Sequence, residues 1–410
     1  MSVKVENFGC RLNALEGDSV KALAEAAGLS DTTIINGCAV TNEAMRQAGQ
    51  AARRAKRDNP DGTVIVTGCA AQTDADKFTA MAEVDRVIGN EEKLHPASYG
   101  DTASFAVSDI MQVTQATALP PVATQKRARA FVQVQTGCDH RCTFCIIPYG
   151  RGNSRSVPVD EIVHRCQNLV ADGHQEIVLT GVDITSWGPD IGAPGLGTLV
   201  RAILDRVPQL PRLRLSSIDA VEIDAGLLDM VIAEERLMPH LHLSLQAGDN
   251  MVLTRMKRRH TREEAIDFCA RLRDARPDMT FGADLIAGFP TESDAMFENS
   301  LKLVDDCALT WLHVFPYSAR PGTPAARMPQ VDGATIKARA AQLRAAGDRQ
   351  RHQWLAGQIG QQLSVLVEKP DEGRSSHFAR IRLNRPQAVG SLLTAQITGH
   401  DGQMLEGDIL

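Results

Sequence analysis

The segment Phe131-Val-Gln-Val-Gln-Thr-Gly-Cys138-Asp-His-Arg-Cys142-Thr-Phe-Cys145 joins a strand-like run to a loop that carries three cysteines. From this segment to residue 316, short apolar or β-branched runs alternate with helical patterns. The predicted strands are 131–135, 176–180, 213–217, 241–246, 280–286 and 312–316, and the predicted helices are 160–171, 198–207, 225–233, 262–275 and 295–306. Six β/α units with right-handed crossovers predict a full or partial barrel, with an open doubly wound sheet as the alternative.

The first hundred residues show the same alternation. The predicted strands are 3–8, 32–35, 63–67 and 85–88, and the predicted helices are 16–27, 43–57 and 74–83. This spacing predicts a separate α/β domain with a parallel sheet. Residues 101–125 lose the periodicity and end near Pro120-Pro121, which indicates a linker.

The pattern changes again near the C-terminus. A helix is predicted over 336–355, and after it apolar residues alternate with polar ones in steps of two. The alternating apolar residues are Leu363, Val365, Val367, Ala379, Ile381 and Leu383. They predict a small all-β module. The expected α/β organisation is an N-terminal domain over 1–100, a linker over 101–128, a central partial (β/α)6 barrel over 129–356 and a β barrel over 357–410.

The composition is that of a folded protein. Of the 410 residues, 43% are hydrophobic and 23% are charged, which excludes a mostly disordered chain. No apolar run approaches the roughly 18 residues of a membrane span, and the first residues hold no apolar signal region. We therefore expect a cytoplasmic protein that does not bind membranes.

The formal net charge of −6 does not indicate a nucleic-acid-binding protein, so any basic surface must be local. Two local basic groups lie after the fourth predicted barrel strand and along the helix before the β module. They are Arg255, Lys257, Arg258, Arg259, His260 and Arg262, and Arg339, Arg344, Arg349 and Arg351. Each group is either a phosphate contact or an ordinary solvated surface, and the sequence leaves both interpretations open.

The nine cysteines, an odd number in a long chain, favour metal or redox chemistry over a disulfide framework. Cys138, Cys142 and Cys145 offer three thiolates to a single iron–sulfur cluster. A four-iron cluster normally takes four protein ligands, so three would leave one iron open to a small molecule. Structural zinc prefers four ligands in paired motifs, and no partner pair is visible. Three unconnected loop thiols are the remaining alternative.

A second group of cysteines lies in the N-terminal domain. Cys10, Cys38 and Cys69 each follow a predicted strand by two or three residues. In a parallel sheet these loops leave one edge, so the thiols can converge although they lie 28 and 31 positions apart. A glycine precedes each of them and permits a tight turn beside a bulky cluster. The spacing favours a second cluster, with chance placement as the alternative.

The other cysteines do not join these groups. Cys166, Cys269 and Cys307 occur with apolar residues at helical spacing and are predicted to be buried on helix faces. His140 lies inside the first cysteine loop, where three thiolates are already available. We therefore favour a loop role for His140 over metal ligation.

The C-x3-C-x2-C spacing at the mouth of a β/α barrel resembles the radical S-adenosylmethionine (SAM) superfamily. The resemblance implies that the open iron binds the amino and carboxylate groups of SAM, and that reductive cleavage gives a 5′-deoxyadenosyl radical. It places Phe144 near the adenine of SAM, and Thr180, Gly181 and Asp183 near its amino group. Polar residues that end later strands are expected to line the same mouth, although ordinary strand-end hydrogen bonds explain them equally well: Ser216, Ser217, Ser244 and Gln246.

Three N-terminal motifs resemble the signatures of the methylthiotransferase family: Asn7-Phe-Gly-Cys10-Arg-Leu-Asn13, Asn36-Gly-Cys38-Ala-Val-Thr-Asn-Glu-Ala44 and Val66-Thr-Gly-Cys69-Ala-Ala-Gln72. The central region is similar through Gly150-Arg-Gly, Leu241-His-Leu-Ser-Leu-Gln246, Asp284-Leu-Ile-Ala-Gly-Phe-Pro290 and His313-Val-Phe-Pro-Tyr-Ser-Ala-Arg-Pro-Gly-Thr-Pro324. One departure is Gly37, where the family usually has Thr. The resemblance covers essentially the whole chain and is weakest after Gly357, where the family carries a small RNA-binding β barrel called TRAM.

The resemblance implies a tRNA-modifying enzyme whose cofactors are SAM and two 4Fe–4S clusters. The catalytic cluster would be held by Cys138, Cys142 and Cys145, and a sulfur-carrying cluster by Cys10, Cys38 and Cys69. Residues 38–42 and 313–318 look most like the branch that converts threonylcarbamoyladenosine, beside the anticodon, to its 2-methylthio derivative. Branches that act on isopentenyladenosine in tRNA or on a ribosomal protein are the nearest alternatives.

The expected partners are the anticodon loop of tRNA and an electron donor such as a flavodoxin or ferredoxin, and the chain is expected to be a monomer. An aromatic C–H bond of adenosine is too strong to be broken by side-chain bases, so the cofactor must break it. The protein positions the reactants and excludes water. Two hypotheses from other classes remain. One is an iron–sulfur electron carrier, and the other is a noncatalytic RNA-binding protein stiffened by metal.

Overall fold

The N-terminal part of the chain is a five-stranded parallel sheet in the order β1-β2-β3-β4-β5. The computed structural model describes residues 3–100, 105–117, 119 and 127–410. The strands are β1 (Lys4–Asn7), β2 (Thr32–Gly37), β3 (Thr63–Gly68), β4 (Arg86–Ile88) and β5 (Phe105–Ala106). The first four lie where the sequence predicts strands. The fifth comes from the segment predicted as a linker, of which residues 101–104, 118 and 120–126 lie outside the described part.

The helices of this domain are α1 (Arg11–Ala26), α2 (Asn42–Asp58), α3 (Cys69–Thr73) and α4 (Ala75–Thr79). The helix predicted over 74–83 is present but shorter, because Asp74 is its N-cap (φ −151°, ψ 55°) and the helix ends at Thr79. Cys10 is the N-cap of α1, and Cys69 is the first residue of α3. Both thiols therefore lie where free backbone N–H groups favour negative charge.

The central part is a partial (β/α)6 barrel made of two parallel sheets. The first contains β6 (Arg129–Gln133), β9 (Glu176–Thr180) and β10 (Arg212–Leu215), and the second contains β11 (Ser217–Ile218), β12 (His240–Gln246), β13 (Thr280–Ala287) and β14 (Leu309–Pro316). The predicted strand 213–217 is thus two strands. Its first half pairs with β9 and its second half with β12, and the partner changes at Ser216. The described strands β6 and β14 do not pair, so the barrel has an open side.

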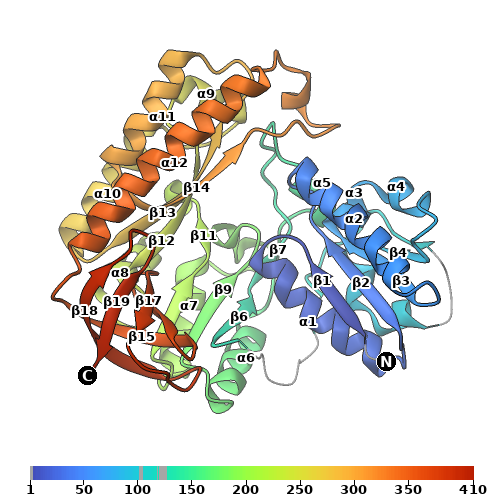
Figure 1. Cartoon of the computed structure of the whole chain (residues 1–410), viewed down its shortest axis with the longest axis horizontal. Helices are drawn as coiled ribbons and strands as arrows, with labels where there is room; N and C mark the ends of the chain where they lie inside the picture. Colours follow the sequence, from blue (N-terminus) through green and yellow to red (C-terminus); the bar gives the residue numbers. More distant parts are fainter. Residues whose placement is uncertain (1–2, 101–104, 118, 120–126) are drawn as a thin grey trace.

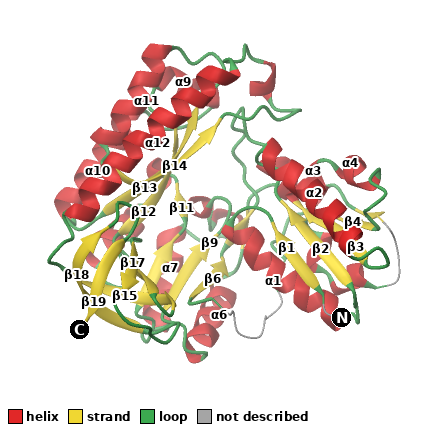
Figure 2. Cartoon of the chain, viewed as in Figure 1, coloured by secondary structure: helices red, strands yellow, loops and turns green. Residues whose placement is uncertain are grey.

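Helices cover the outer face of the barrel (Figures 1 and 2). They are α6 (Val159–Ala171), α7 (Leu196–Arg206), α8 (Ala225–Ala233), α10 (Arg262–Ala275), α11 (Asp294–Asp306) and α12 (Gly333–Ala356). Cys166, Cys269 and Cys307 lie fully buried in the core between these helices and the strands, as predicted. Two short helices near the barrel mouth were not predicted, α5 (Ile147–Arg151) and α9 (Asn250–Met256).

Smaller elements complete the loops of the first two domains. A short antiparallel pair, β7 (Gln135–Thr136) with β8 (Arg155–Ser156), brackets the cysteine loop. The 3-10 helices are η1 (Glu92–Leu94), η2 (Pro96–Tyr99), η3 (Ile110–Gln112), η4 (Ile184–Ser186), η5 (Pro189–Ile191), η6 (Ala220–Glu222) and η7 (Pro324–Arg327). None of the helices in the described ranges is long and apolar enough for a membrane span.

The C-terminal part is a closed five-stranded barrel in the order β15-β16-β17-β19-β18. Its strands are β15 (Gln362–Lys369), β16 (Glu372–Ser375), β17 (Arg380–Leu383), β18 (Leu392–His400) and β19 (Leu405–Ile409). The apolar residues that alternate in the sequence all point into its core, which confirms the period-two prediction: Leu363, Val365, Val367, Ala379, Ile381 and Leu383.

The three parts meet around the open side of the central barrel. On α1, Leu15 packs against Phe131 and Val178 from the strands β6 and β9. At the other end, Nε1 of Trp311 on β14 donates a hydrogen bond to the backbone oxygen of His377 in the C-terminal barrel at 2.9 Å. In Figure 1 the N-terminal domain (blue) and the C-terminal barrel (red) accordingly lie on opposite sides of the central strands.

Candidate active site

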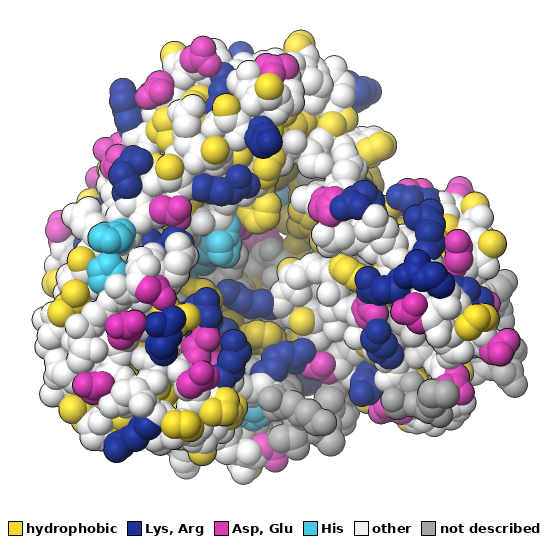
Figure 3. All heavy atoms as spheres, viewed as in Figure 1, with side chains coloured by type: hydrophobic (Ala, Val, Ile, Leu, Met, Phe, Trp, Pro, Cys, Tyr) yellow, Lys and Arg dark blue, Asp and Glu magenta, His cyan; other side chains and the backbone are white. Residues whose placement is uncertain are grey.

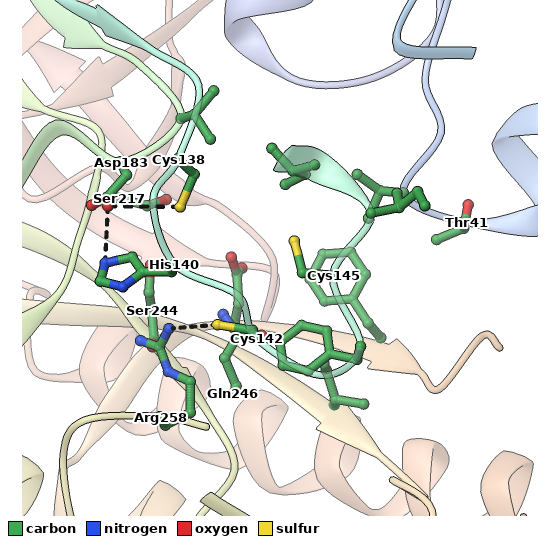
Figure 4. Close-up of a pocket in the computed structure, with 18 of the residues that line it drawn as sticks. Thr41, Cys138, His140, Cys142, Cys145, Asp183, Ser217, Ser244, Gln246 and Arg258 are labelled. Carbon is green, nitrogen blue, oxygen red and sulfur yellow. Dashed lines mark hydrogen bonds and ion pairs between the residues drawn. The ribbon is translucent and has the colours of Figure 1, made fainter. Parts of the chain in front are cut away.

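A cavity of about 240 Å³ opens at the carboxyl ends of the barrel strands. Cys138, Cys142 and Cys145 line it from the loop that follows β7, and Figure 4 shows all three thiols beside the same space. Catalytic groups gather at this end of β/α barrels because the strand-to-helix loops meet there. The structure therefore brings the three predicted ligands to the mouth of the barrel.

The thiols have properties suited to a metal cluster. Burial, with a smaller contribution from the neighbouring Cys142 thiolate, raises the pKa of Cys145 to about 12. Such thiols are protonated at neutral pH until a cation binds and displaces the proton. Nη1 of Arg258 lies 3.7 Å from Sγ of Cys142 and provides a fixed positive charge beside the site. Among the described residues no fourth cysteine lines the cavity, so one corner of a four-iron cluster would face open space.

His140 holds the cysteine loop in place. Its Nε2 lies 3.0 Å from Oδ2 of Asp183 and 3.3 Å from Oε2 of Glu222. Hydrogen bonds to these two carboxylates raise the pKa of His140 to about 10 although burial opposes the charge. A protonated imidazole has no lone pair for a metal. The loop role predicted for His140 therefore agrees with its contacts.

The predicted SAM contacts divide into two groups. Five of them line the cavity: Phe144, Asp183, Ser217, Ser244 and Gln246. The other three lie behind its wall: Thr180, Gly181 and Ser216. Gly181 packs so closely that an added Cβ would lie 2.8 Å from Ile184, which indicates a packing role for this glycine.

Aromatic rings form one wall of the cavity. The ring of Phe144 meets the edge of Phe289 at 6.4 Å between centroids, and Phe289 meets Tyr317 at 5.8 Å. Phe144 and Tyr317 both line the cavity. This wall is suited to the flat, apolar faces of a purine.

Three charged residues that the sequence analysis did not select as site residues also line the cavity. Nη2 of Arg258 donates a hydrogen bond to Oδ2 of Asp219 at 2.5 Å. Asp284 accepts from Nε2 of His242 at 2.8 Å and contacts Nδ1 of His313 at 3.2 Å. A sequence signal existed for Asp284, because it is a carboxylate within an otherwise apolar strand run. The run of basic residues around Arg258 suggested a place on the surface, but the guanidinium of Arg258 is buried.

The second cysteine group converges at the carboxyl edge of the N-terminal sheet. Burial, together with the nearby thiolates of Cys69 and Cys10, raises the pKa of Cys38 to about 11. A Cβ on Gly9, whose φ is 140°, would lie 2.9 Å from Cβ and 3.4 Å from Sγ of Cys38. Only glycine therefore allows the loops of Cys10 and Cys38 to approach this closely.

A buried ion network lies beneath this second group. Nη1 of Arg151 and Nζ of Lys93 each lie 2.7 Å from a carboxylate oxygen of Glu16. Burial alone would raise the pKa of Glu16, but the two cations outweigh it and lower the pKa to about 2. The charges of Cys69 and Cys10 favour the protonated form of Arg151. The network thus places an excess positive charge below three potential thiolates.

The two cysteine groups lie close together, and the loop after Cys38 reaches the cavity. Val40 and Thr41, which follow Cys38 closely, form part of its wall, and Figure 4 shows Thr41 across the space from Cys138. The charge of Cys69 raises the pKa of Cys145. A Cβ on Gly150, in the helix after the cysteine loop, would lie 3.2 Å from Cβ of Cys69. The thiols that line the cavity itself are Cys138, Cys142 and Cys145, and the opening of the second group into the same chamber stays a prediction.

Comparison with known proteins agrees with this arrangement. Residues 132–304 match the Radical SAM superfamily, and residues 2–89 match a family described as Uncharacterized protein family UPF0004. The threonylcarbamoyladenosine tRNA methylthiotransferase of Rickettsia prowazekii (strain Madrid E) is 47% identical over 97% of this chain and 94% of its own. This chain belongs to the radical SAM methylthiotransferase family.

More distant members of the methylthiotransferase family align over a similar extent. The enzyme of the same name from Aquifex aeolicus (strain VF5) is 33% identical over 97% of this chain and 100% of its own. The tRNA-2-methylthio-N(6)-dimethylallyladenosine synthase of Novosphingobium aromaticivorans is also 33% identical, over 96% of this chain and 94% of its own. Membership of the superfamily establishes SAM and a 4Fe–4S cluster as cofactors of this methylthiotransferase.

One solved structure supports the fold. The radical SAM methyltransferase TsrM from Kitasatospora setae, with cobalamin and a [4Fe-4S] cluster bound, superposes with a TM-score of 0.54 at 15% identity. The match covers 77% of this chain and 70% of TsrM. At this identity the likeness concerns the fold alone, and it agrees with the α/β barrel described above.

The two basic groups of the methylthiotransferase are mostly paired within the fold. Arg258 and Arg339 are enclosed by acidic partners, Asp219 for the first and Glu292 for the second. Arg255, Arg259 and Arg262 likewise contact Thr291, Glu222 and Asp306. Lys257, Arg344 and Arg349 are exposed. Pairing within the fold therefore leaves fewer free charges in each group than the sequence suggests, and phosphate contact stays a prediction.

Proposed function

We propose that this chain converts N6-threonylcarbamoyladenosine beside the anticodon of tRNA to its 2-methylthio derivative. The observation that carries the proposal is that the second cysteine group lies next to the cysteine loop that lines the cavity. The 47% identity to a relative named for this substrate supports the choice of nucleoside. The dimethylallyladenosine synthases are more distant, at 30–33% identity.

The first triad gives the cavity its radical chemistry. Cys138, Cys142 and Cys145 would hold a 4Fe–4S cluster that, with SAM on its open iron, supplies a radical able to remove hydrogen from C2 of the adenine. Phe144 and the aromatic wall behind it would hold a purine face. Asp183, Ser217, Ser244 and Gln246 would bind the polar groups of SAM, with Asp183 oriented by His140.

The second triad would provide the sulfur. Cys10, Cys38 and Cys69 have the converging placement and the nearby positive charge that a second 4Fe–4S cluster requires. That cluster would supply a sulfur for the C2 position, methylated by another SAM. The net change replaces the C2 hydrogen with a methylthio group, and the hydrogen leaves in 5′-deoxyadenosine.

The protein itself positions these reactants and excludes water. Closure of the cavity between the barrel mouth and the loop at Val40 and Thr41 keeps a reactive radical away from solvent. Electrons would come from a flavodoxin or ferredoxin, and the C-terminal barrel over 357–410 would contact the RNA. We further propose that the chain acts as a monomer in the cytoplasm.

Mass spectrometry of tRNA nucleosides from a deletion strain tests the proposal. We expect methylthio-threonylcarbamoyladenosine to disappear and threonylcarbamoyladenosine to accumulate. The wild-type gene and a Cys166→Ala control should restore the product, because Cys166 is buried away from both triads, whereas Cys142→Ala should not. Unchanged methylthio product in the deletion strain, without a redundant enzyme, would contradict the substrate assignment.

A further inference from the structure

An arginine cluster lies where the three parts of the chain meet. Its members surround the ring of Phe378, a residue with a positive φ of 73° at the edge of the C-terminal barrel. The four guanidinium carbons lie 4.4 to 5.5 Å from the ring centroid. They belong to Arg11 of α1, Arg129 of β6, Arg214 of β10 and Arg374 of β16.

The cluster has more positive charge than its carboxylates neutralise. Glu368 pairs with Arg129 at 2.6 Å and with Arg374 at 3.0 Å. Glu176 pairs with Arg214 at 2.8 Å and also with the adjacent Arg212 at 3.3 Å. The carboxylates of Glu368 and Glu176 therefore pair with four arginines, and Arg11 brings the number of arginines to five.

Several donors of the cluster have no acceptor. Within the described ranges, Arg11 makes no hydrogen bond or ion pair, and Nη1 of Arg129 and Nη1 of Arg214 have no hydrogen-bond partner. The side chain of Arg214 is only 1% exposed, so water does not satisfy it freely. A buried donor without a partner is costly, and charged donors cost most. Such a set of donors is typical of a site that an anion completes.

The cluster adjoins the catalytic cavity. The ring of Phe378 stacks on the ring of His240 with 4.8 Å between centroids, and His242, two residues further along β12, bonds to Asp284. Asp284 lines the cavity, but its hydrogen bonds go to His242 and His313. Arg11, Arg129 and Arg374 are partly exposed. Figure 3 shows a hollow between the three parts of the molecule, with Lys and Arg side chains (dark blue) along its edge.

We infer that Arg11, together with the free Nη1 atoms of Arg129 and Arg214, binds the carboxylate of the threonylcarbamoyl group on the substrate adenosine. The inference rests on the proposed function. A guanidinium and a carboxylate match in a planar, bidentate geometry. The site lies inside the barrel beside a cavity-lining residue, where the modified base must enter, rather than on an outer surface that an RNA backbone follows. The cluster would thus select an acidic N6 substituent over an apolar one.

The test compares anticodon stem-loops that differ only at this carboxylate. One carries threonylcarbamoyladenosine, the second its neutral threoninamide analogue, and the third unmodified adenosine. Their dissociation constants with the reconstituted enzyme are measured by fluorescence anisotropy. We expect the wild type to bind the acid at least about tenfold more tightly than the amide, the range expected for hydrogen bonds between charged groups.

Substitution of Arg11 should remove this preference. Arg11→Gln should bind acid and amide equally, Arg11→Lys should retain part of the difference, and the exposed control Arg57→Gln should behave as wild type. Iron content, measured in each preparation, shows whether the neighbouring Cys10 site is intact. The wild-type comparison of acid with amide does not depend on the folding of any variant.

Two results would overturn the inference. Equal affinity of the wild type for acid and amide would exclude a carboxylate site. An equal loss of affinity for all three stem-loops in Arg11→Gln would show that the arginine binds backbone phosphate. Failure of the proposed function looks different, because the wild type would then bind the acid stem-loop and cleave SAM without forming a methylthio product.

Discussion

Arg258 shows how one side chain serves the catalytic site from outside the ligand set. Its guanidinium lies 3.7 Å from Sγ of Cys142 and also donates to the backbone oxygen of Ser244 at 2.6 Å. Burial opposes its charge, but Asp219 and the Cys142 thiolate outweigh burial and raise the pKa of Arg258. The residue therefore remains charged beside Cys142.

Replacement of Cys142 tests the assignment of the first triad. In the reconstituted enzyme, Cys142→Ala should lower the rate of 5′-deoxyadenosine formation by at least about 100-fold, because even residues behind a metal ligand cost 10–100-fold when removed. Iron bound at the Cys10 group should remain. Cys269→Ala removes a buried thiol elsewhere and should keep the wild-type rate. Normal SAM cleavage by Cys142→Ala would contradict the assignment.

The buried carboxylate of Glu16 gives a prediction on pH. Its pKa falls from the usual 4.5 to about 2 in the folded protein. The stabilisation is therefore complete above about pH 4.5 and is lost as the pH falls towards 2. Glu16→Gln leaves Lys93 and Arg151 buried without their partner and should destabilise the protein by about 3 kcal/mol at neutral pH.

Urea unfolding of wild type and Glu16→Gln between about pH 6 and pH 3 measures this effect. The difference between the two proteins should shrink as the pH falls. The matched control is Glu25→Gln, on the exposed side of the same helix. A wild-type to Glu16→Gln difference that stays constant with pH would show that the ion network does not lower the pKa of Glu16.

Among the elements, the pair of α12 and β14 is joined by a close helix-to-strand contact. Gly347 on α12 faces Leu312 on β14, and an added Cβ would lie 2.8 Å from Cβ of Leu312. Both the strand and the helix are long, so the contact fixes one wall of the cavity. This wall contains Phe315, at the end of β14, and Tyr317, in the loop after it. Helix packing at this glycine therefore positions cavity residues.

Substitution of Gly347 tests this packing. Gly347→Val should force the helix away from the strand and lower stability by about 1–3 kcal/mol, the usual range for overpacking. Thermal unfolding measures the effect, with Ala345→Val on the exposed face of α12 as the control for the β-branched side chain. Equal melting temperatures for the two variants would show that the contact is not tight.

Element prediction from the sequence succeeded where local pattern and pairing agree. Strand β9 was predicted at its observed bounds, 176–180, because a buried apolar run is flanked by clear breaks. The strand 213–217 was predicted as one element because its apolar pattern is continuous. Its division at Ser216 depends on which neighbour each half pairs with, β9 or β12, and that choice is made by distant residues.

Site prediction shows the same limit. The six cysteines were found by spacing, because Cys138, Cys142 and Cys145 share one short loop and the loops of Cys10, Cys38 and Cys69 leave parallel strands at one edge. Arg258 was assigned to a basic surface because its partners, Asp219 and Cys142, are remote in sequence. Charged residues whose partners come from other loops are not recognisable from local pattern. The structure is needed to separate a buried ion pair from a solvated surface.

At the scale of the whole molecule, the central barrel is joined to both flanking parts by polar contacts. Nη2 of Arg212 donates to Oγ of Ser364 at 2.8 Å, and Nε of Arg129 donates to Glu368 at 2.6 Å. On the other side, Arg151 of the barrel pairs with Glu16 of the N-terminal domain at 2.7 Å. This contact joins α5, which follows the first cysteine loop, to α1, whose N-cap is Cys10.

The central proposal is that the two neighbouring cysteine triads have separate tasks. The most direct test is a single reaction with reconstituted Cys38→Ala enzyme, SAM, a reductant and a stem-loop carrying threonylcarbamoyladenosine, analysed by mass spectrometry. The account predicts that 5′-deoxyadenosine is formed and that no methylthio nucleoside appears. A methylthio nucleoside formed at the wild-type rate by this variant would contradict it.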